Sequence, residues 1–153
     1  MSDDIKRLPP WLVQKARLSD IHSMKQALRG KGLHTICESA RCPNIGRCFA
    51  KPTATFLIMG DRCTRGCAFC AIDSAPPLPL DSDEPMQVAE QAAELGLKHV
   101  VITSVTRDDL PDGGAHHFAR CCRSVKDRLP DATCEVLTPD FQGRAESLDT
   151  LAG

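Results

Sequence analysis

The chain has 153 residues, of which 42% are hydrophobic and 25% are charged, and its formal net charge is −1. This size and composition are those of an ordinary globular domain with its own core, and the balanced charge gives no electrostatic reason to expect a nucleic-acid partner. The apolar runs are far too short to span a membrane and the acidic start does not resemble an export signal, so we expect a cytoplasmic protein with no membrane partner.

The cysteine content is high, with nine cysteines in the chain. An intracellular protein keeps its thiols reduced, and grouped cysteines there are more often metal ligands than disulfide partners. Six of the nine form two groups, which we term the first triplet (Cys37, Cys42 and Cys48, spaced C-x4-C-x5-C) and the second triplet (Cys63, Cys67 and Cys70, spaced C-x3-C-x2-C).

Residues 1–52 are expected to form an N-terminal extension. Trp11 is expected to anchor a local core, and Ser19–Gly30 has the apolar spacing of a helix. The first triplet follows this helix, and the turn formers Pro43 and Gly46 lie between its members. We expect this bending of the chain to bring the three sulfur atoms to one centre.

Residues 53–153 alternate predicted strands with predicted helices. In chain order these are the strand Thr55–Met59, the helix Glu84–Leu95, the strand His99–Val105, the helix Ala115–Leu129, the strand Thr133–Leu137 and the helix Arg144–Leu151. This order is typical of an α/β fold with parallel strands and right-handed crossovers. Functional loops in such folds lie at the carboxyl ends of the strands.

The second triplet directly follows the first of these predicted strands. Soft thiolate ligands select zinc or an iron–sulfur cluster. A Cys₄ zinc site usually comes as two C-x-x-C pairs, a form that neither triplet has. Three cysteines can hold three irons of a four-iron cluster and leave the fourth iron open, and we favour this interpretation over zinc. Arg62 and Arg65 are expected to favour the thiolate form and to offset cluster charge.

The second triplet, with Phe69 before its last cysteine, resembles the signature of the radical S-adenosylmethionine superfamily. The resemblance implies that its cysteines hold a 4Fe–4S cluster and that the amino and carboxylate groups of S-adenosylmethionine chelate the open iron. An electron from the cluster would then release a 5′-deoxyadenosyl radical. The resemblance also implies that Phe69 packs near the adenine and that Gly113 and Gly114 lie beside the methionyl group. The superfamily often has a glutamate after this glycine pair, where this chain has Ala115.

The two triplets together resemble those of the lipoyl synthase family. Three short segments also resemble segments of that family: Leu33-His34-Thr35, Ala40-Arg41-Cys42-Pro43-Asn44 and Arg107-Asp108-Asp109-Leu110. The resemblance implies a sulfurtransferase with two 4Fe–4S clusters, in which the first triplet holds an auxiliary cluster that donates sulfur. The implied reaction is the radical-mediated insertion of two sulfur atoms into an octanoyl chain on a lipoyl carrier domain, which gives the lipoyl cofactor. The implied partners are octanoylated carrier domains of 2-oxoacid dehydrogenase subunits and of the glycine cleavage carrier protein, together with an electron donor.

The fold implied by this resemblance is a partial parallel (βα) barrel of the radical S-adenosylmethionine type, with about three βα units after an N-terminal cluster-binding extension. A complete barrel is typically about 250 residues long, so we expect the chain to be the N-terminal portion of a longer enzyme. Residues 1–52 would be the extension and residues 53–153 the first half of the barrel. The family takes a fourth ligand of the auxiliary cluster from a serine that this portion would lack. Arg47 and Phe49 replace an acid and a tryptophan that the family often has.

Two other functions stay open on the sequence alone. One is a different radical S-adenosylmethionine enzyme with an auxiliary cluster, such as another sulfur-inserting enzyme. The other is a zinc-binding or electron-transfer module, which is not an enzyme.

The remaining polar and sulfur-bearing residues are expected to have structural roles. The other cysteines fall within a predicted helix or strand and should be small core residues: Cys121, Cys122 and Cys134. His116 and His117 are expected to be solvated or to cap a helix rather than to bind metal. Asp108 and Asp109 are expected to make loop hydrogen bonds rather than to form a catalytic pair.

Overall fold

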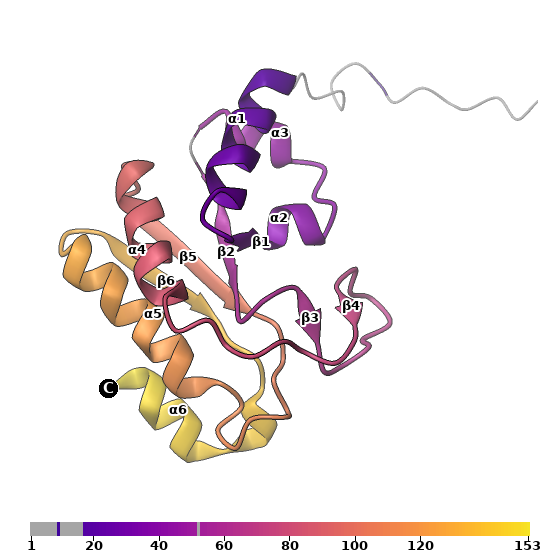
Figure 1. The fold of residues 1–153 in the computed structure, drawn as a ribbon, viewed down its shortest axis with the longest axis vertical. Coiled ribbons are helices and arrows are strands. Elements are labelled where there is room, and N and C mark those ends of the chain that lie inside the picture. Colours follow the sequence, from indigo (N-terminus) through magenta and orange to yellow (C-terminus); the bar gives the residue numbers. More distant parts are fainter. Residues whose placement is uncertain (1–8, 10–16, 52) are drawn as a thin grey trace, which may run out of the picture.

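The computed structural model describes residues 9, 17–51 and 53–153, and Trp11 lies outside these residues. Its main sheet has the strand order β1-β2-β5-β6. The strands are β1 (His34–Thr35), β2 (Thr55–Ile58), β5 (His99–Ser104) and β6 (Thr133–Leu137). The last three are mutually parallel, whereas β1 pairs antiparallel with β2 (Figure 1). The expected α/β architecture with a parallel sheet is therefore confirmed.

Each parallel strand is followed by a helix: α4 (Glu84–Glu94), α5 (Ala115–Arg128) and α6 (Ala145–Ala152). Helix α5 lies between α4 and α6 (Figure 1). Pro85 occupies the first turn of α4, where a missing amide hydrogen costs no hydrogen bond. Gly96 follows α4 with a φ of 63°, the left-handed conformation that commonly ends a helix.

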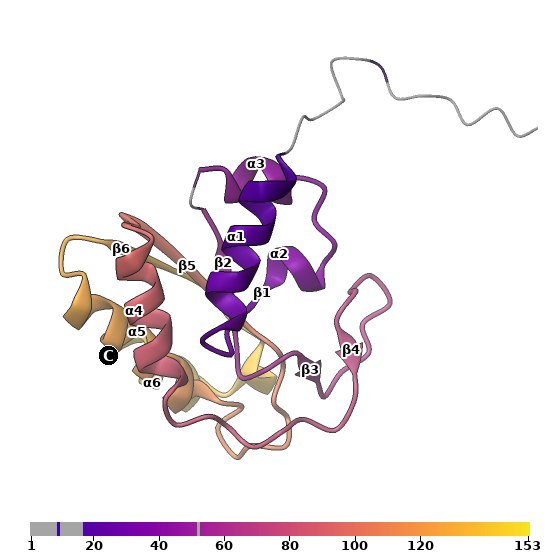
Figure 2. The same ribbon diagram turned by 45° about the horizontal axis from the view of Figure 1, so that its top comes forward.

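The N-terminal segment forms its own small group of helices on the other side of the molecule (Figure 2). These are α1 (Leu18–Arg29), α2 (Ile36–Ser39) and α3 (Ile45–Phe49). Met24, Leu28 and Phe49 from this segment are buried in the same hydrophobic core as β2 and α5. The segment is thus joined to the sheet both by β1 pairing and by shared core packing.

The burial of the strands follows their position in the sheet. Phe56, Leu57 and Ile58 are consecutive and all fully buried, so both faces of β2 are covered. In β6, by contrast, Val136 and Leu137 are exposed, and β6 is one of the two edge strands of the sheet within the described residues. Helical spans long and apolar enough to cross a membrane are absent from the described part of the chain.

The predicted regular elements agree with the structure to within one or two residues, but several short ones were missed. These are β1, α2, α3 and a separate parallel pair, β3 (Arg62–Cys63) with β4 (Asp73–Ser74). Strands of two residues have no periodicity for a sequence pattern to show, and α2 and α3 have only four and five residues.

Candidate metal centre

The carboxyl ends of β2, β5 and β6 lie at one edge of the sheet because the three strands are parallel. Arg65 on the loop after β2 reaches residues on both of the other two loops. Its Nε and Nη2 donate to the carboxylate of Asp108 at 2.6 and 2.8 Å, and its Nη1 donates to Asp140 at 2.7 Å. This arrangement confirms that Asp108 makes loop hydrogen bonds. It also fastens the second triplet's loop to the neighbouring loops.

Further hydrogen bonds complete the attachment. The hydroxyl of Thr64 donates to the carbonyl of Thr106 at 3.0 Å, and the Asp108 amide donates back to that hydroxyl at 3.1 Å. Gln142 donates to Asp108 at 2.7 Å. The hydrogen bonds from Arg65 and then Gln142 hold the pKa of Asp108 below its ordinary value.

The structure corrects the expected role of Arg65. The hydrogen bonds that it donates to Asp108 and Asp140 raise the pKa of Arg65 above its ordinary value. Two carboxylates already offset its single charge, so Arg65 does not bring a free positive charge to the cysteines. Its contribution is to hold the loop in place.

The second triplet lies on a loop that we term the second-triplet loop, residues 60–75, which closes through β3 and β4. In Figures 1 and 2 the β3–β4 pair lies apart from α4, α5 and α6, on the side of the molecule that carries α2. Cys63 is half-buried, and its Sγ accepts hydrogen bonds from the Thr106 and Arg65 amides at 3.3 and 3.5 Å. Cys67 and Cys70 are exposed. One thiol is thus held by the sheet edge, and the other two lie on the open part of the loop.

Phe69 and the two glycines have definite places in this region. The Phe69 side chain is 94% exposed, so it does not belong to the core and is available to contact a ligand. Gly114 has a φ of 87°, and a Cβ there would lie 2.4 Å from Sδ of Met59. A Cβ on Gly113 would lie 3.1 Å from Cδ1 of Phe141. The glycine pair therefore allows close packing against the end of β2 and the loop after β6; its place beside a methionyl group stays a prediction.

The first triplet is built by short-range backbone hydrogen bonds. The Cys42 amide donates to the Cys37 carbonyl at 3.0 Å, and the Cys48 amide donates to the Asn44 carbonyl at 3.0 Å. Arg41, which precedes Cys42, has a φ of 50° and makes the turn tight. Burial raises the pKa of the Cys37 thiol, and the nearby thiols of Cys42 and Cys48 raise it further. All three residues are half-buried, and their sulfur atoms do not all lie within 4.8 Å of one another. The expected meeting of the three sulfurs at one centre therefore stays a prediction.

The donor sets of both triplets suit a cluster better than a single ion. A single ion needs ligand atoms that converge on one point, whereas the cysteines of a cluster bind different iron atoms and stand further apart. Among the described residues only one trio, Glu84, His117 and Cys121, has ligand atoms that all lie within 4.8 Å of one another. Both triplets are more open than this and offer sulfur alone.

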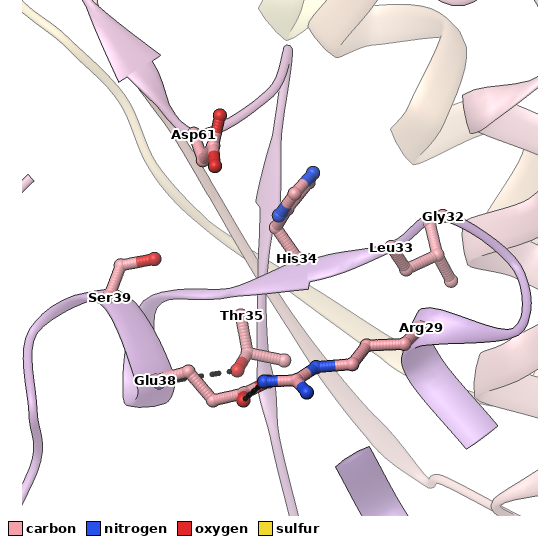
Figure 3. A pocket seen from close by; sticks show the side chains of 8 residues that line it. All are labelled: Arg29, Gly32, Leu33, His34, Thr35, Glu38, Ser39 and Asp61. Atoms are coloured by element: carbon pink, nitrogen blue, oxygen red, sulfur yellow. Dashed lines mark hydrogen bonds and ion pairs between the residues drawn. The ribbon is translucent and has the colours of Figure 1, made fainter. Parts of the chain in front are cut away.

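A cavity of about 460 Å³ lies between the segments that carry the two triplets. Its lining residues are Arg29, Gly32, Leu33, His34, Thr35, Glu38, Ser39 and Asp61. Figure 3 shows the His34 ring, the Ser39 hydroxyl and the Asp61 carboxylate on one side, and the ion pair of Arg29 with Glu38 on the other. Sequence analysis singled out Leu33, His34 and Thr35 as a family-like segment but did not predict the cavity that they line.

The two histidines in the first turn of α5, His116 and His117, differ in burial and in hydrogen-bond partner. His116 is exposed, and its Nδ1 lies 2.7 Å from Asp112 near the helix start, in agreement with the expected solvated or capping role. The same expectation for His117 is wrong: its side chain is buried, and its Nε2 lies 2.7 Å from Oε2 of the equally buried Glu84. The sequence contained no local signal for this pair, because its members are 33 residues apart on two helices.

The three cysteines outside the triplets lie on α5 and β6. Cys121 is fully buried, as expected, and burial raises its pKa. Cys122 and Cys134 are only half-buried and share a hydrogen bond across α5 and β6. That bond raises the pKa of Cys122 and lowers the pKa of Cys134 to about 7.

The chain is similar in sequence to curated lipoyl synthases. Curated relatives include the lipoyl synthase of Caldanaerobacter subterraneus subsp. tengcongensis, 54% identical over 145 residues, and that of Oleidesulfovibrio alaskensis, 56% identical over 146 residues; each match covers 95% of this chain. The chain spans about half the length of these relatives, 51% and 50% respectively. The resemblance to lipoyl synthases is thereby confirmed. The model of the radical SAM superfamily matches residues 57–153, more than half of the chain, and the chain belongs to that superfamily.

Proposed function

We propose that this chain forms the cluster-binding portion of an enzyme of the lipoyl synthase type. The observation that carries the proposal is the presence of two separate cysteine triplets in a chain 54% identical to a lipoyl synthase over 95% of its length. The proposed activity is insertion of two sulfur atoms into the octanoyl chain of a lipoyl carrier domain, with the help of an electron donor. The proposed location of the protein is the cytoplasm.

The six triplet cysteines are the proposed ligands of two 4Fe–4S clusters, one on each triplet. When bound, these clusters and S-adenosylmethionine would supply radical chemistry and sulfur. Three ligands at the second triplet would leave one iron open for S-adenosylmethionine. The exposed Phe69 would contact the adenine, and Gly113 and Gly114 would allow the backbone to approach the methionyl group.

The chain's own contribution is to hold the second triplet in one orientation. Arg65 attaches the loop to Asp108 and Asp140, so the cysteines are placed relative to the loops that follow β5 and β6. Such fixed placement lowers the cost of bringing reacting groups together. We further propose that β2, β5 and β6 with their helices are about three βα units of a partial barrel, after an N-terminal extension over residues 1–52.

Anaerobic reconstitution with iron and sulfide tests the two-cluster assignment. We expect about eight irons per chain in the wild type and about half of that when either triplet is replaced by alanine. S-adenosylmethionine should change the electron paramagnetic resonance spectrum of the reduced cluster only while the second triplet is intact. Zinc uptake without sulfide would contradict the proposal. Iron loading that is lost completely with either triplet would indicate one shared site.

The substrate class needs its own test. The reconstituted chain should bind octanoylated carrier domain more tightly than it binds unmodified carrier domain. If binding requires the rest of the enzyme, the same comparison is made with the complete enzyme. Isothermal titration with the two forms measures this difference. Equal binding of the two forms would favour a different sulfur-inserting enzyme.

A further inference from the structure

Met59 is the residue at which the chain leaves β2 and enters the second-triplet loop. It has a φ of 67°, a left-handed conformation that is unfavourable for a residue with a side chain. The residue is nonetheless buried, and Gly60 beyond it also has a positive φ, of 90°. The direction of the whole loop is therefore set at two consecutive residues, and the first of them needs outside support to keep its conformation.

That support comes from Glu84, in the first turn of α4. Both of its carboxylate oxygens accept the Met59 amide hydrogen, with distances of 3.1 Å to Oε1 and 2.9 Å to Oε2. The two residues are 25 positions apart, and the Glu84 side chain is only 8% exposed. Burying a carboxylate is costly unless donors surround it, so its place in the core marks a specific contact rather than a chance one.

The second donor to this carboxylate is His117 of α5. Its Nε2 lies 2.7 Å from Oε2 of Glu84, and its side chain is 4% exposed. The helix that carries His117 begins directly after Gly114, the residue whose missing Cβ leaves room for the Met59 sulfur. Two helices therefore hold Met59, one through its amide and the other through its side chain.

Cys121 completes a compact trio with Glu84 and His117, which raises the alternative of a buried metal site. Two observations argue against it. Both oxygens of Glu84 already accept hydrogen bonds. Burial and the neighbouring Glu84 also raise the pKa of the Cys121 thiol, which disfavours the thiolate that a metal would require.

We propose that Glu84 and His117 are positioning residues for the second triplet. They hold Met59 in its left-handed conformation and thereby fix the direction in which the cysteine loop leaves the sheet. The inference rests on one part of the proposed function, namely that the second triplet holds a cluster. Neither residue is proposed as a cluster ligand, since the side-chain hydrogen bonds of Glu84 go to Met59 and His117.

The first test measures hydrogen exchange at the Met59 amide in the metal-free chain. Glu84→Ala removes both acceptors and should speed exchange at least tenfold, and Glu84→Gln, which keeps one acceptor oxygen, should give an intermediate rate. Gln91→Met is the matched control, because Gln91 is equally buried on α4 and its Oε1 has no hydrogen-bond partner. The control should leave the Met59 rate unchanged. Equal exchange in wild type and Glu84→Ala would overturn the proposal.

The second test separates the two triplets. With the first triplet replaced by alanine, Glu84→Ala and His117→Ala should lose at least half of the remaining iron, together with the spectral response to S-adenosylmethionine. With the second triplet replaced instead, the same substitutions should leave the iron content unchanged. Loss of iron from both triplets would show general unfolding and would contradict a positioning role.

The outcomes also separate this inference from the proposed function. A wild-type chain that takes up no cluster at the second triplet refutes the proposed function, while the exchange measurement still tests the hold on Met59. Full iron loading and an unchanged spectral response in Glu84→Ala refute the positioning role alone. Stoichiometric zinc in a chain whose triplets are both replaced would establish the metal site of Glu84, His117 and Cys121 and overturn the proposal.

Discussion

The two triplets are held by different kinds of structure. The first is shaped mainly by hydrogen bonds between residues close in sequence, such as the Cys42 amide with the Cys37 carbonyl, and Thr55 of β2 adds a backbone hydrogen bond to Cys37. The second depends on residues far away in the chain: Arg65 binds Asp108 43 positions on, and Met59 is held by Glu84. The first thiols are half-buried, whereas Cys67 and Cys70 are exposed. The first triplet should therefore depend less than the second on distant parts of the fold.

The largest effect should follow from filling the space beside Met59. In Gly114→Ala the new Cβ would lie 2.4 Å from the Met59 sulfur, at a backbone φ of 87°. We expect a loss of about 2 kcal/mol in the free energy of unfolding, from crowding and backbone strain together. Urea denaturation measures this loss. Gly143→Ala, also at positive φ but in open space, is the control that isolates the crowding, and an equal loss there would contradict this explanation.

The next effect concerns the attachment of Arg65. Asp108 has a lower pKa in the folded chain than in the unfolded one, so its carboxylate adds stability above the unfolded value of about 4. That contribution should be lost progressively as the pH falls below this value. Asp108→Asn should therefore be less stable than wild type by a constant amount between about pH 6 and 8, and the difference should shrink below about pH 4.

Denaturation curves of both proteins across this pH range give the measurement. The same substitution should lower iron loading at the second triplet and leave the first triplet unaffected. A stability difference that grows as the pH falls would contradict the assignment of Asp108 as a stabilising carboxylate.

A third expectation uses cysteines outside both triplets. The hydrogen bond from Cys122 lowers the pKa of Cys134 to about 7, so a large fraction of Cys134 should be thiolate at neutral pH. Alkylation by iodoacetamide, followed by mass spectrometry, should show Cys134 labelling that rises through about pH 7. Cys122→Ala should move this rise to higher pH, and an unchanged profile would refute the hydrogen bond as its cause. Cys121, which is buried, should remain unlabelled in the folded chain.

The smallest effect should come from the first triplet's turn. Arg41 has a φ of 50°, so Arg41→Gly removes an unfavourable conformation at the cost of a more flexible unfolded chain. We expect stability to change by no more than about 0.5 kcal/mol, with iron loading of the first triplet retained. A large loss of iron there would show that the Arg41 side chain, rather than the local turn, shapes the site.

The same contrast explains what could be predicted from the sequence. Strand β6 was predicted with its observed bounds, because residues that favour strands occur in Thr133–Leu137 and turn-forming residues flank this segment. The positions of the six triplet cysteines on two bent segments followed from spacing and turn formers. Local sequence carries this kind of information.

The sequence contains no such local information about contacts between residues far apart in the chain. Arg65 was expected to act through its charge, and only the folded chain shows that Asp108 and Asp140 already offset it. Glu84 and His117 lie on two amphipathic helices. The periodicity of such helices predicts which faces are buried, but it does not predict which buried polar groups contact each other. Strands of two residues, such as β3 and β4, exist because the chain is brought back to itself at Cys63 and Ser74.

One guanidinium group touches all three loops at the carboxyl edge of the sheet, since Arg65 belongs to the first loop, Asp108 to the second and Asp140 to the third. Opening any one of these loops requires breaking contacts with another, so the three should open and close as a single cooperative unit. Amide exchange at Thr64, Asp108 and Gln142 should then report one common opening free energy. The sheet edge would thus present its three loops to a ligand in one shared conformation.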